Sequence, residues 1–322
     1  MSTAGDGKGV KRIRRKLDGV LLLDKPIGMS SNQALQAARR IFNAQKAGHT
    51  GTLDPLATGL LPLCFGEATK FAGELLDADK TYTATLQLGV TTDTGDAEGR
   101  EIARRIVSVT QAEVAAAVAH FLGEIAQIPP MYSALKRDGK PLYEYARAGI
   151  EVERLPRKIT IHKIEMLDCQ NDQVSIEVRC SKGTYIRTLA VDIGERLGCG
   201  AHLIALRRTA TGGMSVASAI SLEALQAMDE GAREASLLAP DALIASLPAF
   251  HLDAEVCARV LQGQAFQPSS GVSAAPTDEP TDQATPAADP RVRLYAEGGR
   301  FLGLGTFGND GWCKPLRLVA SN

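Results

Sequence analysis

The stretch AGHTGTLDPLATGLL, residues 47–61, carries one charged side chain, Asp54, in a loop otherwise built of glycine, threonine, proline and apolar residues, with His49 near its start. Pro55 disfavours the helical conformation at Asp54, so the carboxylate is presented from a stiff, extended turn. Three glycines in the stretch allow close backbone approach or a positive φ. An Asp-Pro turn without chemistry also fits this pattern, but the density of threonine hydroxyls and the nearby His49 favour a ligand-facing loop.

Length and composition predict a globular chain large enough for two domains, with 322 residues, 44% hydrophobic and 23% charged. The longest apolar runs fall far short of the roughly 20 residues that a bilayer span requires. The basic N-terminus is not followed by an apolar segment, so we expect a cytoplasmic protein without membrane association. The six cysteines form no C-x-x-C pair and the five histidines no cluster. Neither a disulfide framework nor a zinc site is therefore expected.

Charge is unevenly distributed, although the formal net charge is only −1. Residues 1–18 form a basic arm, which suits either a disordered terminus or phosphate binding. The acidic stretch 273–290 is rich in Pro, Ala and Thr, and we expect a disordered insertion within 268–290. Because apolar patterns resume on both sides of it, the insertion interrupts one small domain, placed at 249–322, and does not separate two.

Three segments read as strands. Residues 19–25 form a short apolar run that Pro26 ends. Residues 81–89 alternate between apolar and threonine-rich positions, with Tyr82 on the inner face, and residues 173–180 alternate in the same way. Each of the two alternating segments predicts a half-buried strand.

Helical signals lie between these strands. Ser30 or Ser31 can cap a helix, and Thr110 with Glu113 forms a capping box. Apolar residues recur at helical spacing over 186–197, which makes residues 181–185 a strand-to-helix loop. The irregular order of elements favours an α+β fold with a mixed, largely antiparallel central sheet flanked by helices over a doubly wound fold. No dinucleotide-binding or Walker loop is present in the sequence.

Four segments resemble successive motifs of the bacterial TruB family, the tRNA pseudouridine-55 synthases. They are GVLLLDKPIGMSS, GHTGTLDPLATGLLPLCFGEATK, IPPMYSALKRDGKPLYEYARAG and CSKGTYIRTLAVDIG. The resemblance runs from about residue 19 to 213, and the tail FLGLGTFGNDGWCKPLRLV is similar to the end of the family's β-rich, PUA-like RNA-binding domain. It implies a pseudouridine-synthase fold, with a catalytic domain at 19–248 and the PUA-like domain at 249–322.

The activity implied by the resemblance is isomerisation of the uridine at position 55 in the T loop of tRNA. The bond to N1 breaks, the base turns, and it reattaches through C5. Asp54 matches the family's one essential catalytic group, as nucleophile or as base on the ribose. A second carboxylate is not required, because uracil is both the leaving group and the returning nucleophile, in contrast to glycoside hydrolysis. The resemblance implies no cofactor, no metal and no obligate protein partner, and we expect a monomer.

A buried Asp54 needs a compensating cation, because burial raises the pKa of a carboxyl and neutralises it. By the resemblance Arg187 supplies that cation, although its place off the apolar stripe, taken alone, favours a solvated helix residue. The target base must leave its stack, and an aromatic platform recovers part of the cost. Tyr82 matches the residue that stacks on the uracil, and its pattern also suits a plain core tyrosine.

Three further residues match family positions at the site. Tyr185 is placed close to the base and the Asp54 carboxylate, Leu206 lines the pocket, and His49 enters the space that the base vacates in the T loop. Periodicity alone would make Leu206 an ordinary core residue. The segment near 125–155 interleaves Lys and Arg with Tyr132, Tyr143 and Tyr145, which suits either an RNA-gripping segment or a solvated loop.

Two other functions stay open at the level of sequence. The chain could be an RNA-binding or tRNA-folding module without chemistry, which an intact set of Asp54, Tyr82, Tyr185 and Arg187 argues against. It could instead be a hydrolase that uses Asp54 as nucleophile. That alternative is weaker because Asp54 is not part of a D-x-D pair and has no clear second acid beside it in the sequence.

Overall fold

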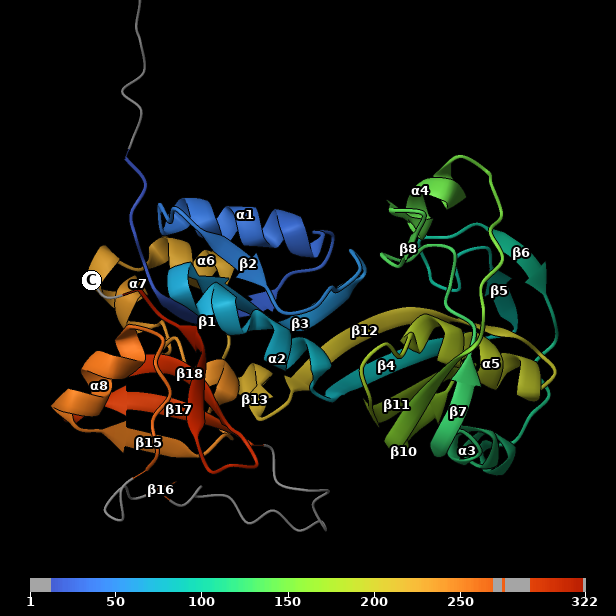
Figure 1. Ribbon diagram of the computed structural model, residues 1–322. Coiled ribbons are helices and arrows are strands. Elements are labelled where there is room, and N and C mark those ends of the chain that lie inside the picture. The colour runs from blue at the N-terminus through green and yellow to red at the C-terminus, as the bar shows by residue number, and fades with distance from the viewer. Residues whose placement is uncertain (1–12, 269–273, 276–289, 321–322) are drawn as a thin grey trace, which may run out of the picture.

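The structure is a computed structural model that describes residues 13–268, 274–275 and 290–320. Within these residues, ten strands form one large sheet, five form a smaller sheet and four form two hairpins (Figure 1). The large sheet contains β1 (Gly19–Lys25), β2 (Ala47–His49), β3 (Ala57–Phe65), β4 (Lys80–Leu88), β7 (Gly123–Gln127), β10 (Arg157–Gln170), β11 (Gln173–Cys180), β12 (Ala201–Thr211), β13 (Met214–Ser215) and β14 (Ile220–Ser221).

The strand order of the large sheet is β14-β1-β3-β12-β4-β11-β10-β7, with β2 added to β3 and β13 to β12. Two pairings are parallel, β1 with β14 and β12 with β3, and the others are antiparallel. The α+β prediction with a mixed, largely antiparallel sheet is confirmed. The hairpins are β5 (Val90–Thr92) with β6 (Glu101–Arg104), and β8 (Lys136–Arg137) with β9 (Lys140–Pro141).

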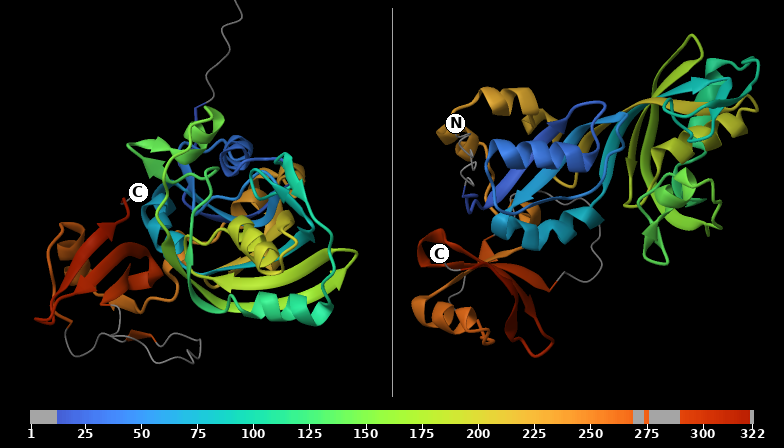
Figure 2. Two further views of the ribbon diagram at one scale, coloured as in Figure 1. Left: turned by 90° about the vertical axis from the view of Figure 1, so that its right-hand side faces the viewer. Right: turned by 90° about the horizontal axis from the view of Figure 1, so that it is seen from above.

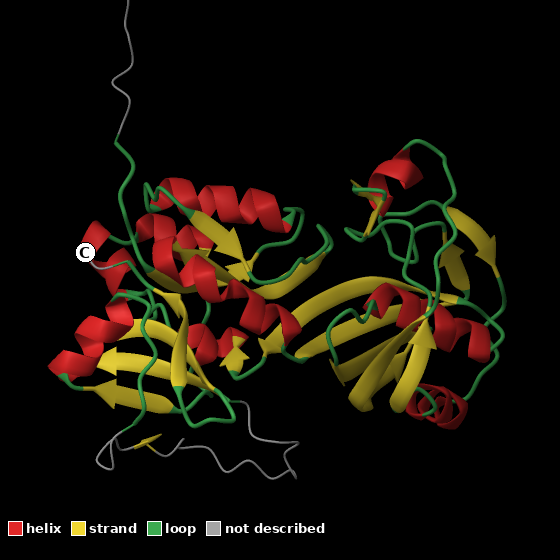
Figure 3. Ribbon diagram, viewed as in Figure 1, coloured by secondary structure: helices red, strands yellow, loops and turns green. Residues whose placement is uncertain are grey.

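Helices flank the large sheet, as Figure 3 shows. Helix α5 packs on β12, and α3 packs on β10. The α-helices of the described chain are α1 (Ser31–Ile41), α2 (Ala72–Asp77), α3 (Gln111–Ala119), α4 (Leu142–Arg147), α5 (Ile186–Arg196), α6 (Leu222–Ala227), α7 (Glu230–Ala235) and α8 (Ala254–Leu261). Its 3-10 helices are η1 (Gly66–Phe71), η2 (Val216–Ser218), η3 (Ala242–Ile244) and η4 (Glu297–Gly299).

The elements expected from local patterns form where they were predicted. Burial alternates along β4 and β11, which places Tyr82 on the inner face of β4. Ser30, not Ser31, caps α1, and Thr110 forms the capping box of α3 with Glu113. The alternation and the capping box are short-range signals, which act between residues two or three positions apart.

The smaller sheet belongs to the C-terminal part of the chain and stands beside the N-terminal half of the large sheet (Figure 2). Phe301 packs on Phe71 of η1 with ring centroids 5.4 Å apart, and Leu304 joins the same apolar cluster. The expected insertion at 268–290 lies mostly outside the described residues. The strands are β15 (Ala249–Leu252), β16 (Ala274–Ala275), β17 (Arg291–Ala296), β18 (Phe301–Phe307) and β19 (Cys313–Leu318).

Residues 1–12 of the expected basic arm lie outside the described residues. Arg15, in its described part, contacts Glu230 and Glu234 of α7, so this cation is engaged within the protein. Among the residues with described structure, no helix is both long and apolar enough to cross a membrane.

Candidate active site

Asp54 lies in the loop that joins β2 to β3 at the centre of the large sheet. The loop closes with a turn in which the Ala57 N–H donates to the Asp54 carbonyl at 3.0 Å. On one side of it stands β12, which places Leu206 beside Ala57, and β4 follows with Tyr82 opposite Arg208. The central strands therefore bring the loop and the inner face of β4 to one site.

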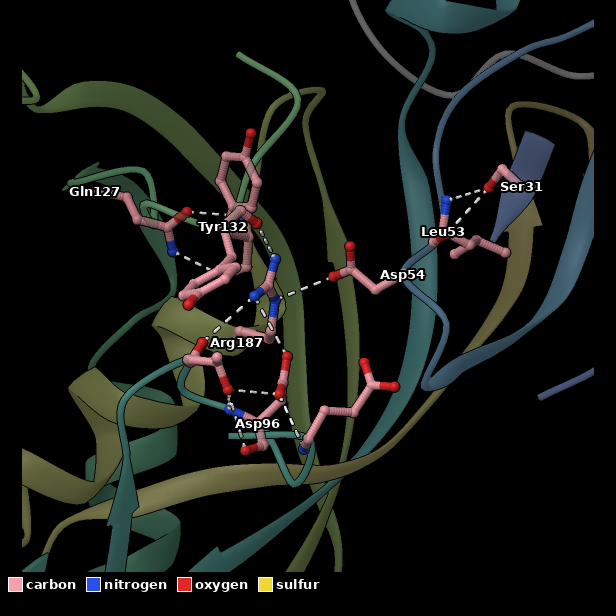
Figure 4. A network of polar contacts seen from close by, with 10 residues as sticks. Ser31, Leu53, Asp54, Asp96, Gln127, Tyr132 and Arg187 are labelled. Carbon is pink, nitrogen blue, oxygen red and sulfur yellow. Dashed lines mark hydrogen bonds and ion pairs between the residues drawn. The ribbon is translucent and has the colours of Figure 1, made fainter. Parts of the chain in front are cut away.

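Arg187 stands in the first turn of α5 and is the hub of the site's polar contacts (Figure 4). Its Nε lies 3.0 Å from Asp54 Oδ2, and its Nη1 lies 3.3 Å from Asp96 Oδ2. Nη1 also donates to the Thr94 carbonyl at 3.3 Å, and Nη2 donates to the Tyr132 carbonyl at 2.7 Å. The side chain is only 6% exposed, so Arg187 is not the solvated helix residue that its position off the apolar stripe allowed.

Asp96 is a buried carboxylate that sequence reasoning did not single out. Its side chain is 4% exposed, and Oδ1 accepts hydrogen bonds from Thr94 Oγ1 at 2.7 Å and from the Glu98 N–H at 3.1 Å. The stretch DTGDAEG around it reads as an ordinary polar turn. Its partner Arg187 comes from a distant helix, and no local spacing signals that contact.

Gln127 is a second residue of the site that local sequence patterns do not single out. It is 2% exposed, its Oε1 accepts from the Tyr185 N–H at 2.8 Å, and its Nε2 donates to the Tyr185 carbonyl at 3.1 Å. Both polar groups of the Tyr185 backbone are thereby held at the start of α5, where the helix offers no partner for the N–H.

A cavity of about 330 Å³ brings together five of the six predicted site residues: Asp54, Tyr82, Tyr185, Arg187 and Leu206. Tyr82 is 9% exposed and belongs both to the apolar core and to the cavity wall, so its core position is confirmed and its role toward a base stays a prediction. The sixth residue, His49, does not line this cavity. It lines a neighbouring depression of about 770 Å³ that also reaches Asp54 and Arg187.

The electrostatics of Asp54 balance burial against two cations, Arg187 and, with a smaller effect, Lys25. Although 40% of the side chain is exposed, burial raises the pKa of the carboxyl; Arg187 opposes the shift and Asp96 adds to it. His49 carries a buried Nδ1 without a hydrogen-bond partner among the described residues, and burial lowers its pKa. His49 is therefore a neutral ring at neutral pH.

The floor of the cavity holds two further buried cations, Lys80 and Arg208. Burial lowers the pKa of Lys80 to about 8, and its ammonium donates to three carbonyls near the end of α2. Arg208 donates through Nε to the Leu60 carbonyl at 2.7 Å, and its Nη2 is buried without an acceptor. Within the described chain it forms no ion pair with a carboxylate. Together with Arg187, these groups make the cavity cationic around one carboxylate, Asp54.

The segment between β7 and β10 forms a roof over the site. Ser133, Ala134 and Leu135 line the cavity, and the Tyr132 carbonyl accepts from Arg187. Farther along the segment, Lys140 lies over the Tyr145 ring at 4.9 Å and Arg147 over the Tyr143 ring at 5.3 Å. Among the described residues, no group of three or more His, Cys, Asp or Glu side chains could hold a metal ion.

Solved structures with a similar fold belong to assemblies that contain RNA or partner proteins. One is described as the structure of an H/ACA RNP bound to a substrate RNA containing 2'-deoxyuridine, with a TM-score of 0.69 and 24% identity over 94% of this chain and 85% of that one. Another is a Cbf5-Nop10-Gar1 complex, with a TM-score of 0.67 and 26% identity over 94% and 84% of the two chains. The first of these likenesses supports the fold alone.

Sequence comparisons give a closer relationship. The tRNA pseudouridine synthase B of Cupriavidus metallidurans is 55% identical over 308 residues, which cover 95% of each chain. That of Azoarcus sp. is 55% identical over 309 residues, 96% of this chain and 97% of the relative.

Three family models match in succession along the chain. Residues 39–186 match the N-terminal domain of the TruB family pseudouridylate synthases, residues 187–247 the C-terminal domain of tRNA pseudouridylate synthase B, and residues 248–319 the C-terminal region of pseudouridine synthase II TruB. With relatives this similar over nearly its whole length, the chain belongs to the TruB family of pseudouridine synthases.

Proposed function

We propose that this chain converts the uridine at position 55 in the T loop of tRNA into pseudouridine, with Asp54 as its one catalytic carboxylate. The observation that carries the proposal is the Asp54–Arg187 pair at 3.0 Å in a cavity walled by Tyr82 and Tyr185, in a chain of the TruB family. A cavity of about 330 Å³ is at the lower end of the range of ligand sites, about 300–1,000 Å³, which suits one extruded nucleoside.

The reaction is an isomerisation whose atoms balance without another reactant. The bond from the ribose to N1 breaks, a bond to C5 forms, the proton on C5 is lost and N1 gains one. Asp54 acts on the ribose, as nucleophile or as base, and must be ionised to do so. Arg187 favours the anion in a site where burial disfavours it. The cationic floor formed by Lys80 and Arg208 favours the negative charge that the departing uracil carries.

The uridine reaches Asp54 only after it leaves the stack of the T loop. Tyr82 offers its ring as a platform for the extruded base, and Leu206 closes the pocket beside it. His49, in the adjoining depression and neutral, suits insertion into the space that the base leaves. The segment near 125–155 and the PUA-like C-terminal domain bind the RNA through cations and rings. The enzyme acts in the cytoplasm as a monomer without an obligate protein partner.

The test is nucleoside analysis of a T-arm stem-loop RNA after incubation with wild type and Asp54→Asn. We expect pseudouridine at position 55 from wild type, none from Asp54→Asn, and similar RNA affinity for both, because phosphate contacts carry most of the binding. Asp168→Asn, an exposed change on β10 away from the site, is the matched control and should leave the activity unchanged.

The alternatives predict other products. A pure RNA-binding module would bind the stem-loop without forming pseudouridine, and a hydrolase would release free uracil or phosphate. Pseudouridine formation by Asp54→Asn would remove that residue from its catalytic role.

A further inference from the structure

The turn KPIGMSS, residues 25–31, has no part in the proposed chemistry, yet it lies against the loop that carries Asp54. It joins β1 to α1 and begins at Lys25, which is fully buried. The Lys25 ammonium donates to the Pro26 carbonyl at 2.8 Å and to the Met29 carbonyl at 2.6 Å. These two bonds fold the turn back on itself and give it a fixed shape.

This turn contacts the residue on each side of Asp54. Ser31 Oγ accepts a hydrogen bond from the Leu53 N–H at 2.7 Å and donates one to the Leu53 carbonyl at 3.0 Å (Figure 4). The Gly28 N–H donates to the Pro55 carbonyl at 2.8 Å. Ser31 and Leu53 are 2% and 3% exposed, so water does not compete for the two Ser31 bonds.

Because peptide bonds are planar, these contacts also fix the position of the Asp54 carboxylate. The Leu53 carbonyl shares a rigid plane with the nitrogen and Cα of Asp54. A hydroxyl that holds this carbonyl therefore fixes the plane from which the Asp54 side chain departs. The bond from Gly28 fixes the plane after Pro55 in the same way. Without them, the long loop between β2 and β3 could rotate the carboxylate away from Arg187.

We propose that Ser31 is a positioning residue, which holds the Asp54 carboxylate at the angle at which it meets Arg187 and the ribose. The proposal rests on the proposed function, because it assigns Asp54 the reacting role. Ser30 is next in the chain and offers a natural contrast. It accepts from the Gln33 N–H and caps α1, and makes no hydrogen bond to the Asp54 loop.

The experiment compares Ser31→Ala with Ser30→Ala in the full-length protein. It measures the single-turnover rate on a T-arm stem-loop, the RNA dissociation constant and the melting temperature. We expect Ser31→Ala to lower the rate by about 10- to 100-fold, since a misplacement of about 1 Å costs on that order, with the dissociation constant within about twofold. Ser30→Ala should lower the melting temperature by about 2–4 °C, as a lost helix cap does, and keep the rate within about twofold.

The pH dependence of the rate separates positioning from loose folding. If Ser31→Ala moves Asp54 away from Arg187, this cation lowers the pKa of Asp54 less, while Asp96 still raises it and Lys25 still lowers it. The rising limb of the rate therefore shifts to higher pH. A purely structural change lowers the melting temperature and leaves that limb where it is. An unshifted limb in Ser31→Ala would overturn the proposal, as would a wild-type rate.

A second variant guards against a Ser31→Ala protein that does not fold. Gly28 has φ +82° and open space around the position of a Cβ, so Gly28→Ala strains the turn without a clash. We expect the same slower rate and shifted limb. Gly198→Ala, at φ +78° with equally open surroundings beyond the end of α5, is the control and should keep both. If wild type forms no pseudouridine, the proposed function is refuted. If wild type is active and Gly28→Ala has the same rate and the same rising limb of the pH–rate profile, the role of the turn is refuted.

Discussion

Asp96 and Asp54 contact different nitrogens of the Arg187 guanidinium. Asp96 Oδ2 lies 3.3 Å from Nη1, whereas Asp54 pairs with Nε. The side chains of Asp96 and Arg187 are nearly fully buried, and Asp96 does not line the cavity beside Tyr82. Arg187 thus divides its charge between Asp54, which lines the cavity beside Tyr82, and Asp96, which lines only the neighbouring depression. Asp96 fixes the plane of the guanidinium, because Nη1 contacts both the Asp96 carboxylate and the Thr94 carbonyl.

Asp96→Asn should lower the rate of the reaction at saturating RNA by roughly tenfold or more, because Asp96 no longer fixes the plane of the Arg187 guanidinium, although Arg187 still pairs with Asp54. RNA affinity should change little. Asp96 adds to the raised pKa of Asp54, so its neutralisation should also move the rising limb of the pH–rate profile to lower pH. Single-turnover kinetics over a pH series measures both effects. A slower enzyme whose limb stays in place would contradict the electrostatic link, and Asp168→Asn is the exposed control.

For wild type, the rising limb of the pH–rate profile should lie at a higher pH than the ordinary pKa of an aspartate. Burial raises the pKa of Asp54 from its usual 3.8, and the reaction requires the anion. As the pH falls through the raised value, the carboxylate takes up a proton and the rate falls. The check is the single-turnover rate from acid to neutral pH, with RNA binding followed in parallel. A limb at or below 3.8 would mean that Arg187 outweighs burial.

The same shift predicts the stability of Asp54→Asn. An acid whose pKa is raised by folding stabilises the folded state at low pH, and this contribution is lost as the pH rises through the folded-state value. At neutral pH the ionised Asp54 therefore works against folding. We expect Asp54→Asn to melt no lower than wild type at pH 7, while it loses all activity. A calorimetric scan that shows a clearly lower melting temperature would contradict this balance.

Tyr82 should matter more for the rate than for RNA binding. Tyr82→Ala removes the ring on which the extruded base stacks, and a base–aromatic stack contributes about 1–3 kcal/mol. We expect a rate lower by roughly 10- to 100-fold at nearly unchanged affinity, because phosphate contacts dominate binding. Tyr82→Phe is the matched control, since it keeps the ring and the packing of the core. Equal rates for the two variants would exclude stacking as the role of Tyr82.

Local patterns were sufficient to predict much of this fold. The alternation around Tyr82 gives the inner face of β4, because neighbours on one face of a strand are two residues apart. The capping box at Thr110 likewise depends only on Glu113. The burial of Arg187 could not be found in this way, since its partners Asp54 and Asp96 come from other elements. The family resemblance pointed to Arg187 and Asp54, but it did not point to Asp96.

The two serines at the start of α1 show where local signals end. Either Ser30 or Ser31 suits a helix cap, and nothing nearby in the sequence chooses between them. The choice is made by Leu53, whose two backbone groups are satisfied by the hydroxyl of Ser31, which leaves the cap to Ser30. Gln127, on β7, likewise makes two hydrogen bonds from its side chain to the backbone of Tyr185. Contacts of this kind appear only once the chain is folded.

Gly59→Ala should destabilise the protein, because the loop after Asp54 enters β3 where two backbones nearly touch. Gly59 has φ +98°, and a Cβ there would lie 2.3 Å from the Arg208 carbonyl oxygen and 2.8 Å from its nitrogen. The left-handed conformation alone costs about 1–2 kcal/mol, and forced repacking adds about 1–3 kcal/mol. At roughly 2–4 °C per kcal/mol, the melting temperature should fall by about 5–15 °C. Gly198→Ala isolates the conformational cost, because its φ is +78° and nothing lies near its Cβ. Equal melting temperatures for the two variants would mean that β3 and β12 can separate at Gly59 without loss, whereas a larger fall for Gly59→Ala locates the rigidity of the site in that contact.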